Sequence, residues 1–134
     1  MTFGQASNAT DGLDAVCGEA LLPSPPPAGN FDSRLVLPDG TQTSSKDFRS
    51  SSATHVIWTM KFQPGSGGYP FRFTWNPAAL PSGSFRLKDT ITGTTVNVDM
   101  KTQNSYALTD TGISSLVIEF GAYTKKFYFP LITQ

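Results

Sequence analysis

The stretch His55–Phe62, HVIWTMKF, alternates with a period of two residues. Successive side chains of a β-strand point to opposite faces, so this period predicts a strand with one buried face. The residues predicted to face the core are Val56, Trp58, Met60 and Phe62. Those predicted to face outward are His55, Ile57, Thr59 and Lys61.

The same period recurs along the chain, between turn signals rich in Gly, Pro and Asp. Further strands are predicted at Phe31–Leu37, Phe71–Trp75, Ser84–Asp89, Thr94–Met100, Tyr106–Leu108, Leu116–Phe120 and Lys126–Ile132. Residues 44–53 are rich in serine and are predicted to form a loop. About seven to nine strands at intervals of about 8 to 12 residues, with no helix, predict an all-β fold. We expect a two-sheet antiparallel β-sandwich with Greek-key or jelly-roll connections.

The first 30 residues have a different composition, because Gly, Pro, Asp and Asn interrupt every regular pattern. They end in the proline-rich run Pro23–Gly29. Proline fixes φ and removes a backbone donor, so an extended segment packed along the edge of the domain is predicted. The apolar residues expected to attach it to the core are Leu13, Val16, Leu21 and Leu22.

Length and charge exclude several classes of protein. The chain has 134 residues, which predicts one domain over 1–134. Ten basic side chains balance ten acidic ones, so no basic surface for nucleic acid is expected. No apolar run approaches the about 20 residues of a membrane-spanning helix, so no membrane insertion is expected. Charged residues make up only 15%, and about 30 Ser and Thr supply much of the polarity, which indicates a secreted or cell-surface module.

The residues needed for hydrolytic catalysis are scarce. His55 is the single histidine and Cys17 the single cysteine, and no Gly-x-Ser-x-Gly turn is present to expose a nucleophile. The acidic residues lie mostly in turns, where Asp stabilises the backbone. We therefore expect a protein that is not an enzyme. Cys17 forms no disulfide within the chain and is predicted to be a small buried side chain.

The densest group of oxygen-bearing side chains lies near the N-terminus. Asp11 and Asp14, with Asn8 and Glu19 beside them, could ligate a structural calcium ion, which takes six to eight oxygens. The alternative is that these residues cap turns by accepting backbone N–H bonds. No other cofactor is expected.

Two Asp-x-Arg pairs flank the serine-rich stretch: Asp32 with Arg34, and Asp47 with Arg49. Residues two apart in a strand share a face. We expect Arg34 to pair with Asp47 across the loop, in a network that locks it.

The candidate ligand-binding residues are Tyr69, Arg72, Trp75 and Asn76. Trp75 ends a predicted strand beside Asn76-Pro77, and Tyr69 lies in a glycine-rich loop, so both aromatic side chains could be exposed. An exposed aromatic ring can stack on a sugar, with Arg72 and Asn76 supplying hydrogen bonds. The alternative is that Trp75 closes the end of the core.

The order and spacing of several short motifs resembles a recurrent bacterial surface module. These motifs are Phe3-Gly4, ATDGLD (residues 9–14), Gly18-Glu19, the proline-rich run, FDSR (31–34), KDFR (46–49) and FTWNP (73–77). The module occurs in secreted multidomain proteins, often ahead of a type IX secretion sorting tail. The resemblance covers roughly residues 3 to 120 and implies a non-catalytic extracellular β-sandwich.

Two functions are compatible with these patterns. The first is an accessory domain of a secreted bacterial protein that binds polysaccharide weakly. The second is a structural spacer or assembly domain near the C-terminus of a surface protein, contacting only neighbouring domains of its parent. Binding requires at least two exposed aromatic side chains on one face or rim, whereas a spacer requires none.

Overall fold

A computed structural model describes residues 1–123, and these residues form an all-β fold without an α-helix. The elements are β1 (Thr2–Ala6), η1 (Ala15–Cys17), β2 (Asp32–Val36), β3 (Thr43–Ser44), β4 (Lys46–Ser50), β5 (His55–Gln63), β6 (Phe71–Thr74), η2 (Pro77–Ala79), β7 (Ser84–Asp89), β8 (Asn97–Asp99), β9 (Ser105–Leu108) and β10 (Ser115–Gly121). The all-β prediction is confirmed. The described part has ten strands, where the sequence predicts seven to nine.

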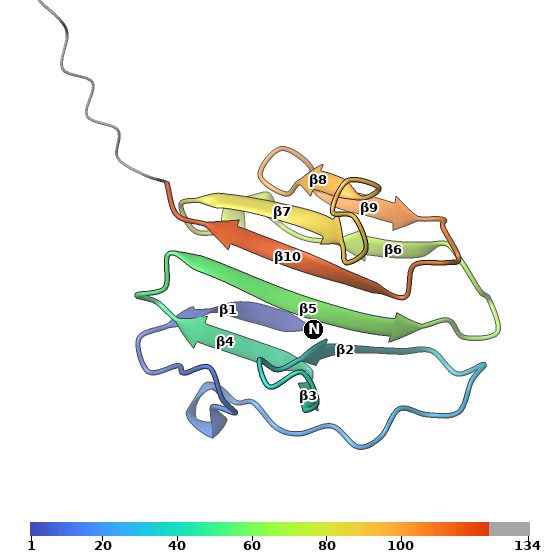
Figure 1. The fold of residues 1–134 in the computed structure, drawn as a ribbon, viewed down its shortest axis with the longest axis horizontal. Helices are drawn as coiled ribbons and strands as arrows, with labels where there is room; N and C mark the ends of the chain where they lie inside the picture. Colours follow the sequence, from blue (N-terminus) through green and yellow to red (C-terminus); the bar gives the residue numbers. More distant parts are fainter. Residues whose placement is uncertain (124–134) are drawn as a thin grey trace, which may run out of the picture.

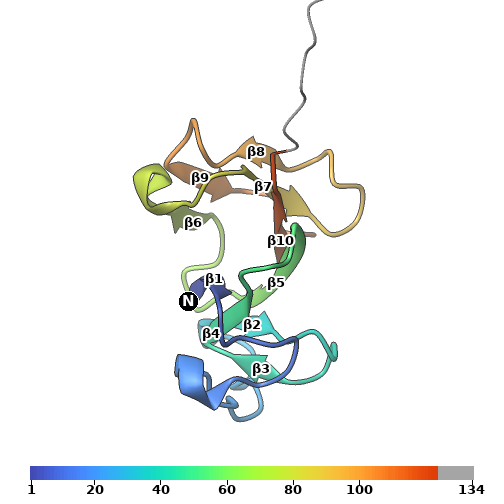
Figure 2. The same ribbon diagram turned by 90° about the vertical axis from the view of Figure 1, so that its left-hand side faces the viewer.

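Six strands form one antiparallel sheet in the order β3-β2-β5-β10-β7-β8 (Figure 1). The remaining four form two small sheets, β1 paired with β4 and β6 paired with β9. The β1-β4 pair is parallel and the β6-β9 pair is antiparallel. Both small sheets lie on the same side of the six-stranded sheet (Figure 2).

Strand β5 is central to the large sheet, and its alternation is as predicted. Its four inward side chains are buried, and Trp58 is 0% exposed. His55, Ile57 and Lys61 of the opposite face are exposed. Trp58 lies opposite Ile118 of β10, so the two longest runs of alternating residues in the sheet pair with each other.

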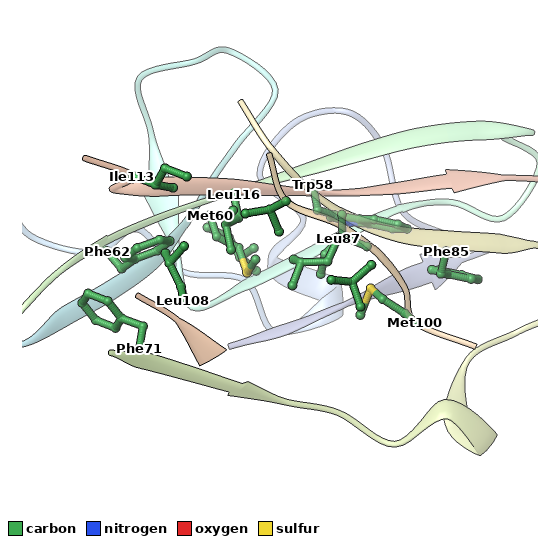
Figure 3. Packing of buried hydrophobic residues seen from close by; sticks show 14 of the residues in the cluster. Trp58, Met60, Phe62, Phe71, Phe85, Leu87, Met100, Leu108, Ile113 and Leu116 are labelled. Carbon is green, nitrogen blue, oxygen red and sulfur yellow. The ribbon is translucent and has the colours of Figure 1, made fainter. Parts of the chain in front are cut away.

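The hydrophobic core lies between the large sheet and the two small ones (Figure 3). Strands β5, β10 and β7 supply most of it, and Phe71 and Leu108 close it from β6 and β9. Aromatic rings follow one another through this space, with Phe62 4.7 Å from Phe71 and Phe85 5.0 Å from Phe120 between ring centroids. The apolar residues that alternate along β7, β8 and β10 are buried as well: Phe85, Leu87, Val98, Leu116, Ile118 and Phe120.

Three strands, β1, β3 and β4, occur where the sequence predicts none. Residues 46–50, inside the predicted loop, form β4, and residues 2–6, inside the predicted extended segment, form β1. The loop prediction was wrong because the inward residues of β4 are Asp47 and Arg49, which neutralise each other. A charged inner face hides the apolar alternation by which a half-buried strand is recognised.

The proline-rich segment follows the edge of the large sheet, but hydrogen bonds rather than apolar side chains hold it. The Gln63 amide donates to the carbonyl oxygens of Pro26, Pro27 and Asn30 at 3.1, 3.3 and 2.8 Å. The prediction that apolar residues attach residues 1–30 to the core was wrong for Leu13, Val16 and Leu21, which are 40%, 72% and 50% exposed. Carbonyl groups of a proline-rich chain have few local donors. The two N–H groups of the Gln63 amide are therefore shared among three of these carbonyls.

The predicted strand Lys126–Ile132 lies outside the described residues. Within residues 1–123, no helix is long and apolar enough to cross a membrane.

The buried carboxylate of Asp89 organises the β7-β8 connection. It accepts backbone N–H bonds from Ile91, Thr92 and Val96 at 3.2, 2.7 and 3.0 Å. These bonds, led by those of Thr92 and Val96, stabilise the charged form and hold the pKa of Asp89 well below its usual range.

We expect Asp89→Asn to weaken the acid dependence of stability. A depressed pKa means that the stabilisation is complete above the unfolded-state pKa of about 4 and is lost as pH falls through the folded-state value. Denaturant unfolding between about pH 6 and pH 2 should therefore show a shallower decline for the variant. An identical decline in both proteins would contradict this role of Asp89.

Candidate binding site between β1 and β6

Two adjoining hollows open between β1 and the segment from Arg72 to Pro81, and together they are called the Trp75 groove. Their volumes are about 250 and 300 Å³, and both are lined by Phe3 and Trp75. The first is floored by Leu35, Met60, Leu87, Met100 and Ile118, and the second by Trp58 and Phe85. The groove therefore lies over the core, at the boundary between the two small sheets.

Trp75 is half-buried in the wall shared by the two hollows. Its indole nitrogen donates to the Met100 carbonyl oxygen at 2.9 Å, and its backbone N–H donates to Asn104. Its ring packs against the core cluster. Both N–H groups of Trp75 thus hold the end of β6 to the chain that follows β8.

Asn76 and Arg72 border the same groove and are exposed. The Asn76 side chain accepts from the Ala78 N–H at 3.1 Å and so begins η2, where Pro77 occupies the first helical position. Arg72 lies on β6 opposite Ala107. The structure therefore brings three of the four predicted binding residues together.

Tyr69 lies apart from the other three, because it precedes β6 whereas Trp75 and Asn76 follow it. It is half-buried, its ring meets Phe71 edge-on at 4.8 Å, and its hydroxyl donates to the Ile113 carbonyl at 2.6 Å. Burial, with a smaller contribution from Asp110, raises the pKa of the Tyr69 phenol. Tyr69 and Trp75 therefore do not form one platform.

A lysine that sequence analysis did not single out fixes the far end of the groove. Lys101 donates from Nζ to the carbonyl oxygens of Leu80 and Pro81, and its ammonium lies 5.5 Å from the Phe85 ring centroid. Pro77 and Pro81 have no backbone N–H, which leaves carbonyls nearby without local donors, and this is the signal that points to such a lysine. Among the described lining residues, Arg72 alone carries an ionisable side chain, so the groove suits apolar or extended chains better than proton transfer.

The predicted calcium residues have other partners. Asp14 is buried, and its two oxygens accept from the Thr10 N–H at 2.8 Å and the Thr10 hydroxyl at 2.7 Å. Asp11 is exposed. Among residues 1–123, no group of three or more His, Cys, Asp or Glu side chains is placed to hold a metal ion. A calcium site at Asp11 and Asp14 remains a prediction.

Glu19 connects distant parts of the chain. Its carboxylate is buried and accepts from the Asp14 N–H at 2.7 Å and from the Phe48 N–H of β4 at 2.6 Å. Cys17 nearby is half-buried and contacts Asn8, with Sγ 3.6 Å from Oδ1. Desolvation, followed by the charges of Asp14 and Glu19, raises the pKa of the Cys17 thiol, which keeps it protonated near neutral pH.

The expected pairing of Arg34 with Asp47 was wrong. Arg34 pairs with Asp32 through two bonds of 2.7 and 2.9 Å, and Arg49 pairs with Asp47 through two bonds of 2.8 and 2.7 Å. The two residues of each pair lie on the same face of one strand, two positions apart, so their side chains are close enough to bond to each other. The expected pairing would instead have had to cross the loop from β2 to β4. Arg34 Nη1 also donates to the Pro23 carbonyl at 2.7 Å, which ties down the proline-rich segment.

A larger hollow of about 690 Å³ lies beside the outer face of β5. Its lining includes Asp11, Arg49, His55 and Lys61. The His55 side chain is exposed and has no hydrogen-bond partner among residues 1–123, so within this part of the chain it is not positioned as a base beside a nucleophile.

Comparison with protein-family models, with characterised proteins and with solved structures found no match to this chain, so its function is argued from its own geometry.

Proposed function

We propose that this chain is a non-catalytic accessory module of a secreted or cell-surface bacterial protein, and that it serves as a structural spacer or assembly domain. Its partners in this role are the neighbouring domains of its parent protein. The resemblance of its motifs to a bacterial surface module supports this proposal, as does the hydroxyl-rich composition.

We also propose that the fold is a two-layer β-sandwich. The six-stranded sheet would be one layer, and β4, β1, β6 and β9 together would be the other. The position of both small sheets on one side of the large sheet, with the core between, supports this assignment (Figure 2).

The observation that favours a spacer is that the buried charged side chains of the described residues are bonded within this chain. The buried charged side chains are Asp14, Glu19, Arg34, Asp47, Arg49 and Asp89. Each of them bonds to this chain's own backbone or side chains. Among the described residues, no buried side-chain nitrogen or oxygen lacks a partner. Polar groups held in this way stabilise the module and leave no buried group directed at a ligand.

Weak carbohydrate binding is the second candidate, and one observation favours it. Trp75 borders a groove beside the exposed side chains of Arg72 and Asn76. Because the indole N–H is already bonded to Met100, only the exposed part of the ring would be left for stacking. One stacked ring contributes on the order of 1 kcal/mol, which is too little for measurable affinity without further contacts.

Retention on insoluble polysaccharides separates the two functions. For a spacer, we expect no retention of the intact chain, and Trp75→Ala should lower the thermal midpoint by roughly 5–10 °C because an anchoring side chain is lost. The double variant Arg72→Ala/Asn76→Ser is the matched control, because it removes the exposed guanidinium and amide but keeps a side-chain oxygen that can accept from the Ala78 N–H. Its midpoint should stay within about 2 °C of the parent. Retention of the intact chain that this double variant abolishes would instead establish carbohydrate binding.

A further inference from the structure

Two unpaired strand edges face the Trp75 groove. Within the described residues, β1 pairs only with β4, and β6 pairs only with β9. The parallel ladder uses Thr2 and Ala6 for bonds toward β4, so the backbone groups of Phe3 and Gln5 point the other way. On β6, bonding of Trp75 N–H to Asn104 sets the alternation, so Arg72 and Thr74 also present their backbone groups away from β9. Unpaired edges of this kind are templates for an added strand.

The two edges run in the same direction, toward the end of the molecule where β10 finishes. Ala6 of β1 is level with Ser50, just before β5 begins, and His55 of β5 pairs with Gly121 of β10. The segment after β6 leads through η2 to Ser84, which also pairs with Gly121. A chain that leaves β10 at Gly121 and turns back therefore enters the groove antiparallel to both edges.

The chain leaves β10 directly beside the groove. A side chain at Gly83 would overlap the Phe120 ring and lie 3.0 Å from the Gly121 carbonyl oxygen, so the Gly83 backbone touches the end of β10. Leu80 and Pro81, three and two residues earlier, line the groove. Facing sheets are about 10 Å apart, and the four residues from 122 to 125 can span about 13 Å. The connection is therefore long enough.

We propose that this chain's own segment Lys126–Phe129 inserts between β1 and β6 as the missing strand. Its apolar residues Phe127 and Phe129 share one face and would fill the groove over the core, while Lys126 and Tyr128 would face outward. Pro130 has no N–H and ends the pairing there. Its four residues equal the length of β6 and are one fewer than those of β1.

The volume and chemistry of the groove suit this occupant. A hollow of about 10–15 Å³ holds one water molecule, whereas these measure about 250 and 300 Å³. Their floor is apolar and needs an apolar cover. Insertion would join β4, β1, the added strand, β6 and β9 into one sheet with no open edge at its centre.

Cysteine cross-linking in the full chain tests the position of the segment. In a Cys17→Ser background, Tyr128→Cys is combined with Arg72→Cys or with Thr74→Cys, both on the exposed outer side of β6. Insertion predicts that one of the two pairs oxidises rapidly to a disulfide within one chain. The control combines Tyr128→Cys with Ile91→Cys, which is 75% exposed in the β7-β8 connection. Oxidation no faster than the control would overturn the proposal, and a disulfide between two chains would show instead that a second copy supplies the strand.

Hydrogen exchange supplies an independent readout. The amides of Phe3 and Gln5 should be as protected as that of Gly4 between them, and those of Arg72 and Thr74 as protected as that of Phe73. In Phe127→Asp/Phe129→Asp, these four amides should lose protection while those of β10 keep it, which distinguishes loss of the strand from global unfolding. Rapid exchange of the four amides in the unaltered chain would overturn the proposal.

Discussion

Replacement of Asp47 by alanine is expected to lower the free energy of unfolding by about 3–5 kcal/mol. Asp47 is 0% exposed, and its two oxygens accept from Arg49 Nε at 2.8 Å and Nη2 at 2.7 Å. Arg49 is itself buried, so removal of the carboxylate leaves a desolvated cation without its partner. Urea unfolding followed by fluorescence measures the difference.

Two control variants separate the stranded charge from the loss of packing. Asp47→Ala/Arg49→Met removes both charges and should recover much of the loss, because no unpaired ion remains. Glu119→Ala removes the carboxylate of a half-exposed pair, 3.4 Å from Lys88, and should cost less than about 1 kcal/mol. If Asp47→Ala were as mild as Glu119→Ala, the buried pair would not stabilise β4.

Replacement of Trp58 by alanine is expected to cost about 3–5 kcal/mol, or to prevent folding altogether. The Trp58 ring is completely buried, 5.0 Å from the Phe3 ring and 6.4 Å from the Phe85 ring between centroids. Its indole N–H donates to the Asp47 carbonyl at 3.0 Å. The side chain thus joins the large sheet to both β1 and β4, and alanine would leave a cavity at that junction.

Trp58→Phe tests which contact matters. Phenylalanine retains most of the ring but leaves the Asp47 carbonyl without its donor, so we expect about 1–3 kcal/mol of destabilisation. Calorimetric unfolding of both variants gives the comparison. A loss for Trp58→Phe equal to that for Trp58→Ala would mean that the hydrogen bond, and not the packing of the ring, carries the stability.

Sequence reasoning succeeded where one face of a strand is apolar. The alternation within His55–Phe62 and within Leu116–Phe120 predicts β5 and β10, and these strands pair at the centre of the sheet. Such residues are buried whichever strand lies beside them, so their pattern is independent of topology. The same reasoning missed β4, because its inward residues, Asp47 and Arg49, are charged and do not show the apolar alternation of a half-buried strand.

The candidate site was predictable in part. The sequence places Trp75 at the end of a strand beside Asn76, and in the structure it borders the groove together with Arg72 and Asn76. The use of its indole N–H was not predictable, because the acceptor, the Met100 carbonyl, lies 25 residues away and is brought near only when β8 packs against β7. The partner of the Tyr69 hydroxyl was unpredictable for the same reason, since its acceptor at Ile113 is 44 residues distant.

The parallel pairing of β1 with β4 has a mechanical consequence. The five registered positions run from Thr2 to Ala6, and the strand points from Met1 toward the end of the molecule where β10 finishes (Figure 1). A tension that pulls on the backbone at Met1 and at Gly121 therefore acts along the length of β1. The hydrogen bonds to β4 are then loaded in shear and share the load, rather than opening one after another as in a zipper. A domain under tension in a surface protein would resist extension through this strand.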